Sequence, residues 1–234
     1  MLKVVLFDFN GVIINDESIH QELIEDILLG ENLTPKAYEF QELCLGRSDR
    51  TCLRDILARR SRIVSDDYLT KLIQKKSISY LEKLEKLEKL PIYSGLETCL
   101  EKVKNKGLRI GLVTGALRSE VDFILQRSVL TRYFEIIVTG EEINNSKPNP
   151  EGYLLAVERF NRLDFNLRLQ PTECLVIEDS PAGIEAAKRA KMQVVGIANT
   201  YPFHFMQRLS NWAIDYLKDL ELERIETVFN RSST

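Results

Sequence analysis

The sequence predicts an α/β protein with a doubly wound parallel sheet and a separate helical insertion. Short apolar runs rich in β-branched residues alternate with helical segments over the second half of the chain. Strands buried on both faces of a parallel sheet have this composition, and the β-α-β-α order favours right-handed crossovers. A long stretch dense in Leu, Glu, Lys and Arg interrupts the pattern early. We therefore expect a Rossmann-like core with an inserted all-helical cap domain.

The first expected strand, Val4–Phe7, is a continuous apolar run that stops at Asp8. Open α/β sheets bind their ligands at the carboxyl ends of such strands, so this carboxylate would lie in the ligand crevice. Gly11 follows three residues later and lets the backbone turn tightly beneath the acid. The alternative is structural, because aspartates often end a strand and begin a turn.

A helical cap is expected between the first strand and the rest of the core. Apolar residues at 23–28 are spaced as on one face of a helix, and the whole segment predicts four or five helices. Thr34 and Ser65 each precede a helical segment and offer a capping oxygen to its first turn. The leucine repeat at 81–90 predicts a helix with solvated glutamates and lysines, which Pro91 ends.

Helices and strands alternate after the cap. Each strand is a short apolar run, and the helices between them keep apolar residues on one face. The expected strands are 109–113, 135–139, 174–177, 193–197 and 212–214. The expected helices are 96–106, 120–127, 150–160 and 182–190, with one more in the tail. We therefore expect residues 1–16 and 91–234 to form the core and residues 17–90 to form the cap.

Composition and charge exclude several classes of function. The net charge of -3 gives no electrostatic case for binding nucleic acid or an anionic membrane. No apolar run approaches the ~20 residues that span a bilayer, and the first run is too short for a signal peptide. The four cysteines are scattered without a C-x-x-C pair, so we expect free thiols in a cytoplasmic protein.

Polar side chains stand where three of the expected strands end. Asp8 follows the first strand, Thr114 the second, and the pair Glu178-Asp179 the fourth, while Lys147 lies on a proline-stiffened loop. Two separated acids can share Mg²⁺, and with a lysine and a hydroxyl they could surround a phosphoryl group. One carboxylate could then attack phosphorus and form an aspartyl-phosphate. Each residue alone is explained by a turn, a solvated loop or a helix cap, but their succession indicates one site.

Four segments resemble the motifs of the haloacid dehalogenase-like superfamily, and more narrowly of its β-phosphoglucomutase-like branch of capped phosphatases and phosphomutases. They are FDFNGVI at 7–13, VTG at 113–115, SKPNP at 146–150 and IEDSPAGIEAA at 177–187. The resemblance covers nearly the whole chain, and the last two segments are its most specific part.

The resemblance implies a role for each matching residue. Asp8 would be the nucleophile and a Mg²⁺ ligand. Thr114 and Lys147 would hold the phosphoryl oxygens, and Asp179 would bind the metal with Glu178 beside it. The residues that the resemblance places against the substrate are His20, Gly46, Arg47, Arg50, Gly115 and Ala116.

The main departure from the family's pattern is Asn10. Phosphotransferases of the family usually carry a second aspartate at this position, which acts as general acid and base. An amide cannot exchange a proton with a leaving group or an attacking water, and the loss of such catalysis costs about 10²–10⁴ in rate. The family residue binds Mg²⁺ through its backbone carbonyl, so Asn10 stays among the expected metal ligands.

The cap departs from the family's pattern as well. Asp49 stands where the sugar-phosphate mutases have a basic residue. Arg47 and Arg50 flank it and could meet a second anionic group, or they could be solvated. His20 lies near the hinge, where it could titrate near neutrality or simply pack. Lys191 replaces the glycine that is usual after the last motif helix, and we expect this replacement to have no effect.

These observations predict a Mg²⁺-dependent phosphatase of a small phosphorylated metabolite, acting through an aspartyl-phosphate on Asp8 and slowed by Asn10. A β-phosphoglucomutase-type sugar-phosphate mutase is one alternative, although it needs proton transfer in both half-reactions, so Asn10 and Asp49 count against it. Another alternative is a phosphate-ligand binding protein that lost efficient chemistry. An acyl phosphate, whose leaving group needs little protonation, would reconcile Asn10 with catalysis.

Overall fold

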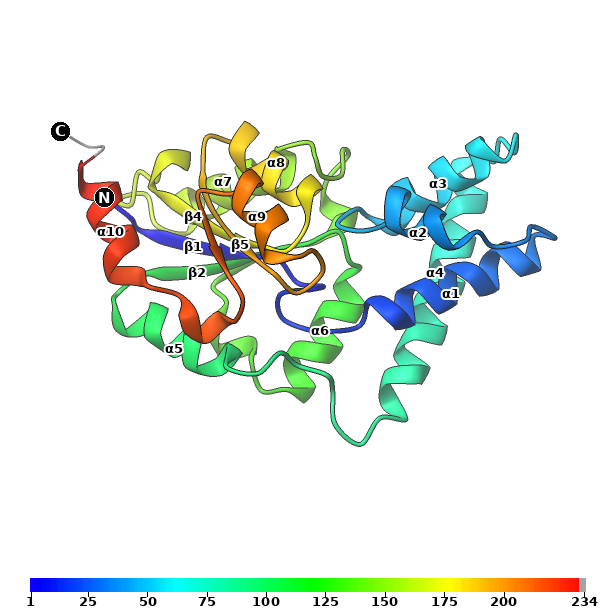
Figure 1. The fold of residues 1–234 in the computed structure, drawn as a ribbon, viewed down its shortest axis with the longest axis horizontal. Helices are drawn as coiled ribbons and strands as arrows, with labels where there is room; N and C mark the ends of the chain where they lie inside the picture. Colours follow the sequence, from blue (N-terminus) through cyan, green and yellow to red (C-terminus); the bar gives the residue numbers. More distant parts are fainter. Residues whose placement is uncertain (232–234) are drawn as a thin grey trace.

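A parallel six-stranded sheet forms the centre of the core in this computed structural model, which describes residues 1–231 (Figure 1). Its strand order is β3-β2-β1-β4-β5-β6, so the chain winds outward in both directions from β1. The strands are β1 Val4–Phe7, β2 Arg109–Val113, β3 Ile136–Val138, β4 Cys174–Glu178, β5 Gln193–Ile197 and β6 Trp212–Ile214. The doubly wound fold that the sequence predicts is therefore confirmed.

Helices cover both faces of the sheet, because alternate residues of each strand point to opposite faces. Val5 and Phe7 of β1 pack with helices α5, α6 and α10, whereas Val4 and Leu6 pack with α7, α8 and α9. Figure 1 shows the two layers on either side of the sheet. The core helices are α5 Leu96–Asn105, α6 Arg118–Arg127, α7 Glu151–Leu163, α8 Pro181–Arg189, α9 Phe203–Leu209 and α10 Leu222–Arg231.

The helical insertion forms a cap beside the sheet (Figure 1). It has a hydrophobic cluster of its own, to which all four of its described helices contribute. The two connections to the core run side by side, since the Asn15 amide donates to Pro91 O over 2.8 Å and the Tyr93 amide donates to Ile13 O over 3.1 Å. The cap helices are α1 Glu17–Gly30, α2 Ala37–Leu43, α3 Asp49–Arg59 and α4 Asp66–Glu85.

Three expectations about helices are corrected by the structure. The helix expected through residue 90 ends at Glu85, and the Arg127 guanidinium donates to Leu84 O and Leu87 O. Those carbonyls therefore have partners outside the helix, and the chain can leave it before the proline. Helix α2 begins at Ala37, after Thr34, without a side-chain cap, and the described part of the tail holds two helices, α9 and α10, where the sequence predicts one. Among residues 1–231, no helix is both long and apolar enough to cross a membrane.

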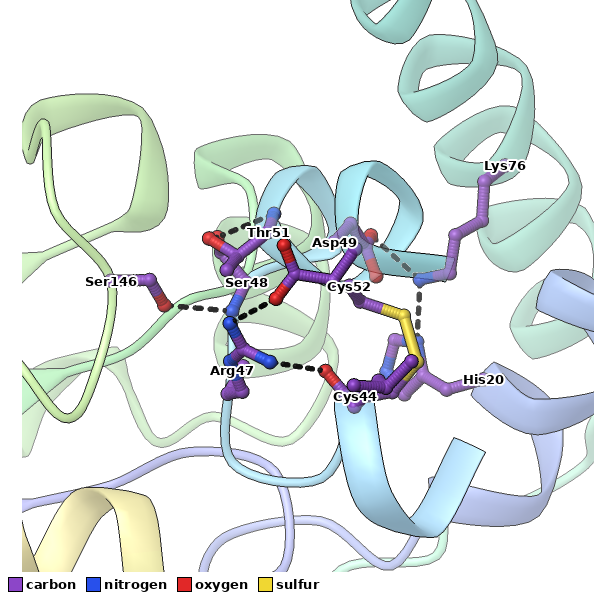
Figure 2. The surroundings of a disulfide bond; sticks show 11 residues. His20, Cys44, Arg47, Ser48, Asp49, Thr51, Cys52, Lys76 and Ser146 are labelled. Atoms are coloured by element: carbon purple, nitrogen blue, oxygen red, sulfur yellow. Dashed lines mark hydrogen bonds and ion pairs between the residues drawn. A yellow bond between two sulfur atoms is a disulfide. The ribbon is translucent and has the colours of Figure 1, made fainter. Parts of the chain in front are cut away.

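The expectation of free thiols is wrong for two of the four cysteines. Cys44 and Cys52 form a disulfide with a Cα–Cα distance of 4.6 Å, whereas Cys99 and Cys174 are free and buried. The loop between α2 and α3 folds back on itself, so the end of one helix meets the first turn of the next (Figure 2). A spacing of eight residues carries no pairing signal in a sequence, which explains the error.

The lysine at position 191 does have an effect, because its backbone is strained in the left-handed region with φ of 63°. It follows α8 in a Schellman-type ending, in which the Met192 amide donates to Ala187 O over 3.0 Å. We expect Lys191→Gly to raise the free energy of unfolding by about 0.5–1 kcal/mol, measured by urea denaturation. Lys188→Gly, within the same helix, is the control and should lower it by about 1 kcal/mol. A loss of stability in both variants would contradict the prediction.

Candidate active site

Asp8 lies at the carboxyl end of β1, beneath the cap, and its side chain is buried. Its amide donates to Ile177 O on the adjacent strand over 3.0 Å, which fixes the backbone at the strand end. Lys147 Nζ lies 2.7 Å from Asp8 Oδ1 and 2.6 Å from Glu178 Oε1. The lysine loop, which includes a cis peptide bond between Lys147 and Pro148, therefore delivers one cation between two strand ends.

A buried acidic cluster forms around this lysine. Oxygen atoms of Asp8, Glu178 and Asp179 all lie within 4.8 Å of one another. Gly11, with φ of 76°, passes so close that a Cβ atom there would overlap the Asp179 carboxylate. Thr200 donates a hydrogen bond to the same carboxylate. Oxygen donors at this spacing suit a hard cation, so the cluster could bind a metal ion.

Glu178 holds the neighbouring groups in place. Its Oε1 accepts from Lys147 and, over 3.0 Å, from the Tyr153 hydroxyl. Its Oε2 accepts from the amides of Asp179 and Ser180 over 3.0 and 3.1 Å. Both oxygens are thus committed to protein donors, which makes Glu178 an anchor for the lysine and for the turn after β4.

Burial and mutual repulsion dominate the electrostatics of the cluster. Burial and the charge of Glu178 raise the pKa of Asp8 to about 7, although Lys147 works against the shift. The pKa of Asp179 is raised for the same reasons, by burial first and then by Glu178 and Asp8. The pKa of Lys147 is raised by Asp8 and Glu178 against the opposing effect of burial, so the lysine stays charged.

Thr114 directly follows β2, which lies on the other side of β1 from β4. Its amide donates to Val138 O over 2.9 Å, and its Oγ1 accepts from the Ala116 amide over 3.0 Å. Because the oxygen already accepts a hydrogen bond, the hydroxyl hydrogen can be donated toward Asp8's side of the cleft. Gly115 passes close to the backbone of Ser48 in the cap, and a Cβ atom there would be crowded.

A cleft of about 50 Å³ lies between the cap and these strand ends. This is far below the ~300 Å³ of a small ligand pocket, so the cap is closed in this structure and must open for substrate. The predicted site residues that line the cleft are Asp8, Asn10, His20, Gly46, Arg47, Thr114, Gly115, Ala116 and Lys147. The cleft is also lined by residues that the sequence does not predict as site residues, namely Glu17, Phe40, Cys44, Asp49 and Glu120.

Comparison with known proteins decides the family. The family model described as haloacid dehalogenase-like hydrolase matches residues 5–197 of this chain. The chain belongs to the haloacid dehalogenase-like hydrolases. It is 27% identical to the phosphorylated carbohydrates phosphatase of Thermotoga maritima, over 85% of this chain and 87% of that protein. It is also 27% identical to a β-phosphoglucomutase of Bacillus subtilis, over 86% of this chain and 85% of that protein.

Solved structures confirm the haloacid dehalogenase-like fold. A β-phosphoglucomutase from Clostridium difficile superposes with a TM-score of 0.84 at 24% sequence identity, covering 99% of both chains. CbbY from Rhodobacter sphaeroides, in complex with phosphate, superposes with a TM-score of 0.79 at 18% identity, over 94% of this chain and 97% of that one. Both carry the same capped architecture.

Asn10 joins a buried network at the hinge between the core and the cap. Its Nδ2 donates to Asp16 Oδ2 over 2.9 Å and lies 3.0 Å from His20 Nε2. Tyr80 of the cap donates its hydroxyl to the same Asp16 carboxylate. Burial opposes the charged form, yet His20, Tyr80 and Asn10 together lower the pKa of Asp16. A charged aspartate therefore lies directly beside Asn10.

The loop between α2 and α3 brings the cap onto the core. The Ser48 amide donates to Ser146 Oγ over 2.9 Å, and Gly46 passes close to Ser180. Lys76 Nζ lies 2.7 Å from Asp49 Oδ2 and 2.7 Å from His20 Nδ1. Figure 2 shows this loop with the disulfide that closes it.

Neither loop arginine offers its full guanidinium to the cleft. Arg47 donates from Nη2 to Asp55 Oδ2 over 2.6 Å and from Nη1 to Leu43 O over 3.1 Å. Arg50 donates to the Thr70 hydroxyl over 2.6 Å and, among the described residues, does not line the cleft. Its substrate contact therefore stays a prediction that this closed arrangement does not support.

Proposed function

We propose that this protein is a Mg²⁺-dependent phosphatase that hydrolyses the phosphate ester of a small metabolite through an aspartyl-phosphate on Asp8. The observation that carries the proposal is the buried Asp8 carboxylate, which lines the cleft and contacts Lys147 over 2.7 Å within a cluster of three acids. A relative named as a phosphatase of phosphorylated carbohydrates matches most of the chain.

The residues around Asp8 supply what phosphoryl transfer needs. An oxygen of Asp8 would form a bond to phosphorus while the bond from phosphorus to the alcohol oxygen breaks, and that oxygen would take its proton from solvent, since the Asn10 amide cannot supply one. Water would then attack the aspartyl-phosphate, releasing phosphate and restoring the carboxylate. Lys147 and the Thr114 hydroxyl face this position and would neutralise the charge that develops on the phosphoryl oxygens.

Magnesium fits the donor set of this site. Asp8 and Asp179 would hold the ion with the backbone carbonyl of Asn10, and Glu178 would support them by fixing Lys147. Three buried carboxylates with one lysine leave an excess of negative charge that a divalent cation would balance. When bound, Mg²⁺ would offset the charge of the phosphate group.

Release of inorganic phosphate tests the proposal directly. The panel comprises sugar and polyol phosphates together with acetyl phosphate, assayed with Mg²⁺ and compared with Asp8→Ala. Turnover of at least one compound above the Asp8→Ala background is expected. Conversion of glucose 1-phosphate to glucose 6-phosphate would restore the mutase alternative. Against that alternative, Asp49 stands where the family's mutases usually have a basic residue, and Asp49 pairs with Lys76 over 2.7 Å.

Because the pKa of Asp8 is raised, the thermal stabilisation by Mg²⁺ should depend on pH. Because the folded pKa of about 7 exceeds the ordinary 3.8, the metal-free folded protein holds a proton that the unfolded chain has lost. That contribution to stability is lost as the pH rises through about 7. Mg²⁺ needs the ionised carboxylate, so the rise in Tm on adding it should be larger at about pH 8 than at about pH 5.5.

Differential scanning fluorimetry with and without Mg²⁺ measures this difference. Asp179→Asn should lose most of the effect, because it removes a proposed ligand from the cluster. Asp67→Asn, an exposed aspartate on α4, is the matched control and should keep it. An equal rise in Tm at both pH values would count against metal binding at these carboxylates.

A further inference from the structure

We propose that this cleft recognises the hydroxyl groups of a polyhydroxylated alcohol, through Glu120 Oε1 of the core and Arg47 Nε of the cap, and rejects substrates with a second anionic group. The inference rests on the proposed phosphatase function and names the substrate class for it. Both side chains line the cleft, one from core helix α6 and the other from the loop before α3.

Carboxylates outnumber cations among the cleft-lining residues other than Asp8 and Lys147. These carboxylates belong to Glu17, Asp49 and Glu120, and the only lysine or arginine among those described lining residues is Arg47. Like charges in a partly enclosed site repel an anion and weaken its binding when no cation compensates. A second phosphate or a carboxylate on the substrate would meet this surface.

The cations near the cleft are already paired. Arg47 uses both Nη atoms on Asp55 and Leu43 O, so it cannot present a bidentate fork to an anion. Lys76 is fully buried and contacts Asp49 and His20. A second anionic group would therefore have to break an existing ion pair before it could bind.

Two buried polar atoms in the cleft are left without partners. Within residues 1–231, Glu120 Oε1 accepts no hydrogen bond and Arg47 Nε donates none, whereas Glu120 Oε2 accepts from the Leu117 amide over 3.2 Å. Glu120 is 1% exposed, so its free oxygen is not hydrated by bulk water. Leaving such groups unsatisfied is unfavourable, and a substrate that pairs with them would recover that free energy.

The two atoms are complementary to hydroxyl groups. A hydroxyl can donate to Glu120 Oε1, and another can accept from Arg47 Nε, so a neutral polyol satisfies both. An ammonium could satisfy only the carboxylate, and a carboxylate or phosphate could satisfy only the arginine. Burial raises the pKa of Glu120, and a donated hydrogen bond from substrate would favour its charged form.

Two matched pairs of phosphate esters test the inference. Each pair differs only by a carboxylate in place of a primary alcohol: sorbitol 6-phosphate with 6-phosphogluconate, and glycerol 3-phosphate with 3-phosphoglycerate. We expect kcat/KM for the better neutral ester to exceed that of its anionic partner by at least about tenfold.

Glu120→Gln separates recognition from folding. Its amide oxygen can still accept from Leu117, so the start of α6 is kept while the charge is removed. In this variant kcat/KM for the neutral ester should fall by about 10–100-fold, and the neutral-to-anionic ratio should shrink to about threefold or less. Glu185→Gln, an exposed glutamate on α8, should change neither value.

Calorimetric binding of the same esters to Asp8→Ala with Mg²⁺ distinguishes this inference from the proposed function. If no compound is hydrolysed but neutral esters bind more tightly than anionic ones, the phosphatase proposal fails and the recognition stands. Anionic esters that bind or react as well as neutral ones would overturn the recognition. It would equally be overturned by an unchanged ratio in Glu120→Gln, or by no detectable binding and turnover of either neutral ester.

Discussion

Asp8→Ala is expected to lower phosphate release from the best substrate by about 10³-fold or more, because it removes the atom that attacks phosphorus. The fold should persist. Burial and Glu178 raise the pKa of Asp8, so its removal relieves repulsion within the acidic cluster. Lys147 also keeps its contact of 2.6 Å with Glu178. Steady-state release of inorganic phosphate with saturating Mg²⁺ measures the loss.

Two further variants show whether the loss is chemical. Asp8→Asn keeps the shape of the side chain and should be as inactive as Asp8→Ala, since an amide is not a nucleophile here. Asp26→Ala, an exposed aspartate on α1, should retain full activity. Circular dichroism and thermal denaturation should give similar profiles for all three. Substantial phosphate release by both Asp8 variants would rule out the aspartyl-phosphate.

The core and its strand-end residues could be predicted because the information is local. The run Val4–Phe7 is apolar throughout, and the structure buries all four residues between two helical layers. A polar residue directly after such a strand has only the sheet edge to occupy. The sequence therefore predicts that Asp8, Thr114 and Asp179 lie at one edge of the sheet.

The cap side of the cleft could not be predicted, because its contacts join residues far apart in the chain. Asp16 meets Tyr80 across 64 residues, and Lys76 meets Asp49 across 27. Such pairs depend on how the helices of the cap pack, and helical spacing alone does not specify partners. Glu120 illustrates the limit, since in the sequence it is one of many glutamates near a helix start.

The Cys44–Cys52 disulfide was missed for a related reason. A spacing of eight residues becomes a short Cα–Cα distance only after α2 and α3 pack against each other. The end of α4 at Glu85 likewise depends on Arg127, which lies in the core and supplies donors that the helix itself lacks. In both places tertiary contacts decide a feature that local pattern leaves open.

Asn10→Asp is expected to raise the turnover of alkyl phosphate esters by about 10²–10⁴-fold, by restoring an acid beside the leaving group. The structure adds a condition. Asn10 Nδ2 lies 2.9 and 3.2 Å from the two oxygens of Asp16, so the variant would place two carboxylates in contact. Like charges at this distance cannot both ionise, and the pair should hold one proton near neutral pH. A shared proton is what a general acid requires.

The double variant Asn10→Asp with Asp16→Asn is the matched control, because it exchanges the two groups and keeps one carboxylate. It retains the acid at position 10 without a contact between two acids, so it should also gain ester turnover, with a lower pKa for the acid in its pH-rate profile. Acetyl phosphate, whose leaving group needs little protonation, should change by less than about tenfold in both variants.

The two substrates together separate the possible failures. A rise for esters alone would show that nucleophile, lysine and cleft are already assembled and that Asn10 limits proton transfer. No rise for esters in either variant, with acetyl phosphate still hydrolysed, would mean that another group already supplies the proton. His20, whose Nε2 lies 3.0 Å from Asn10 Nδ2, is then the residue to replace. Equal gains for both substrates would instead point to an effect on phosphoryl transfer itself, since only the ester needs its leaving group protonated.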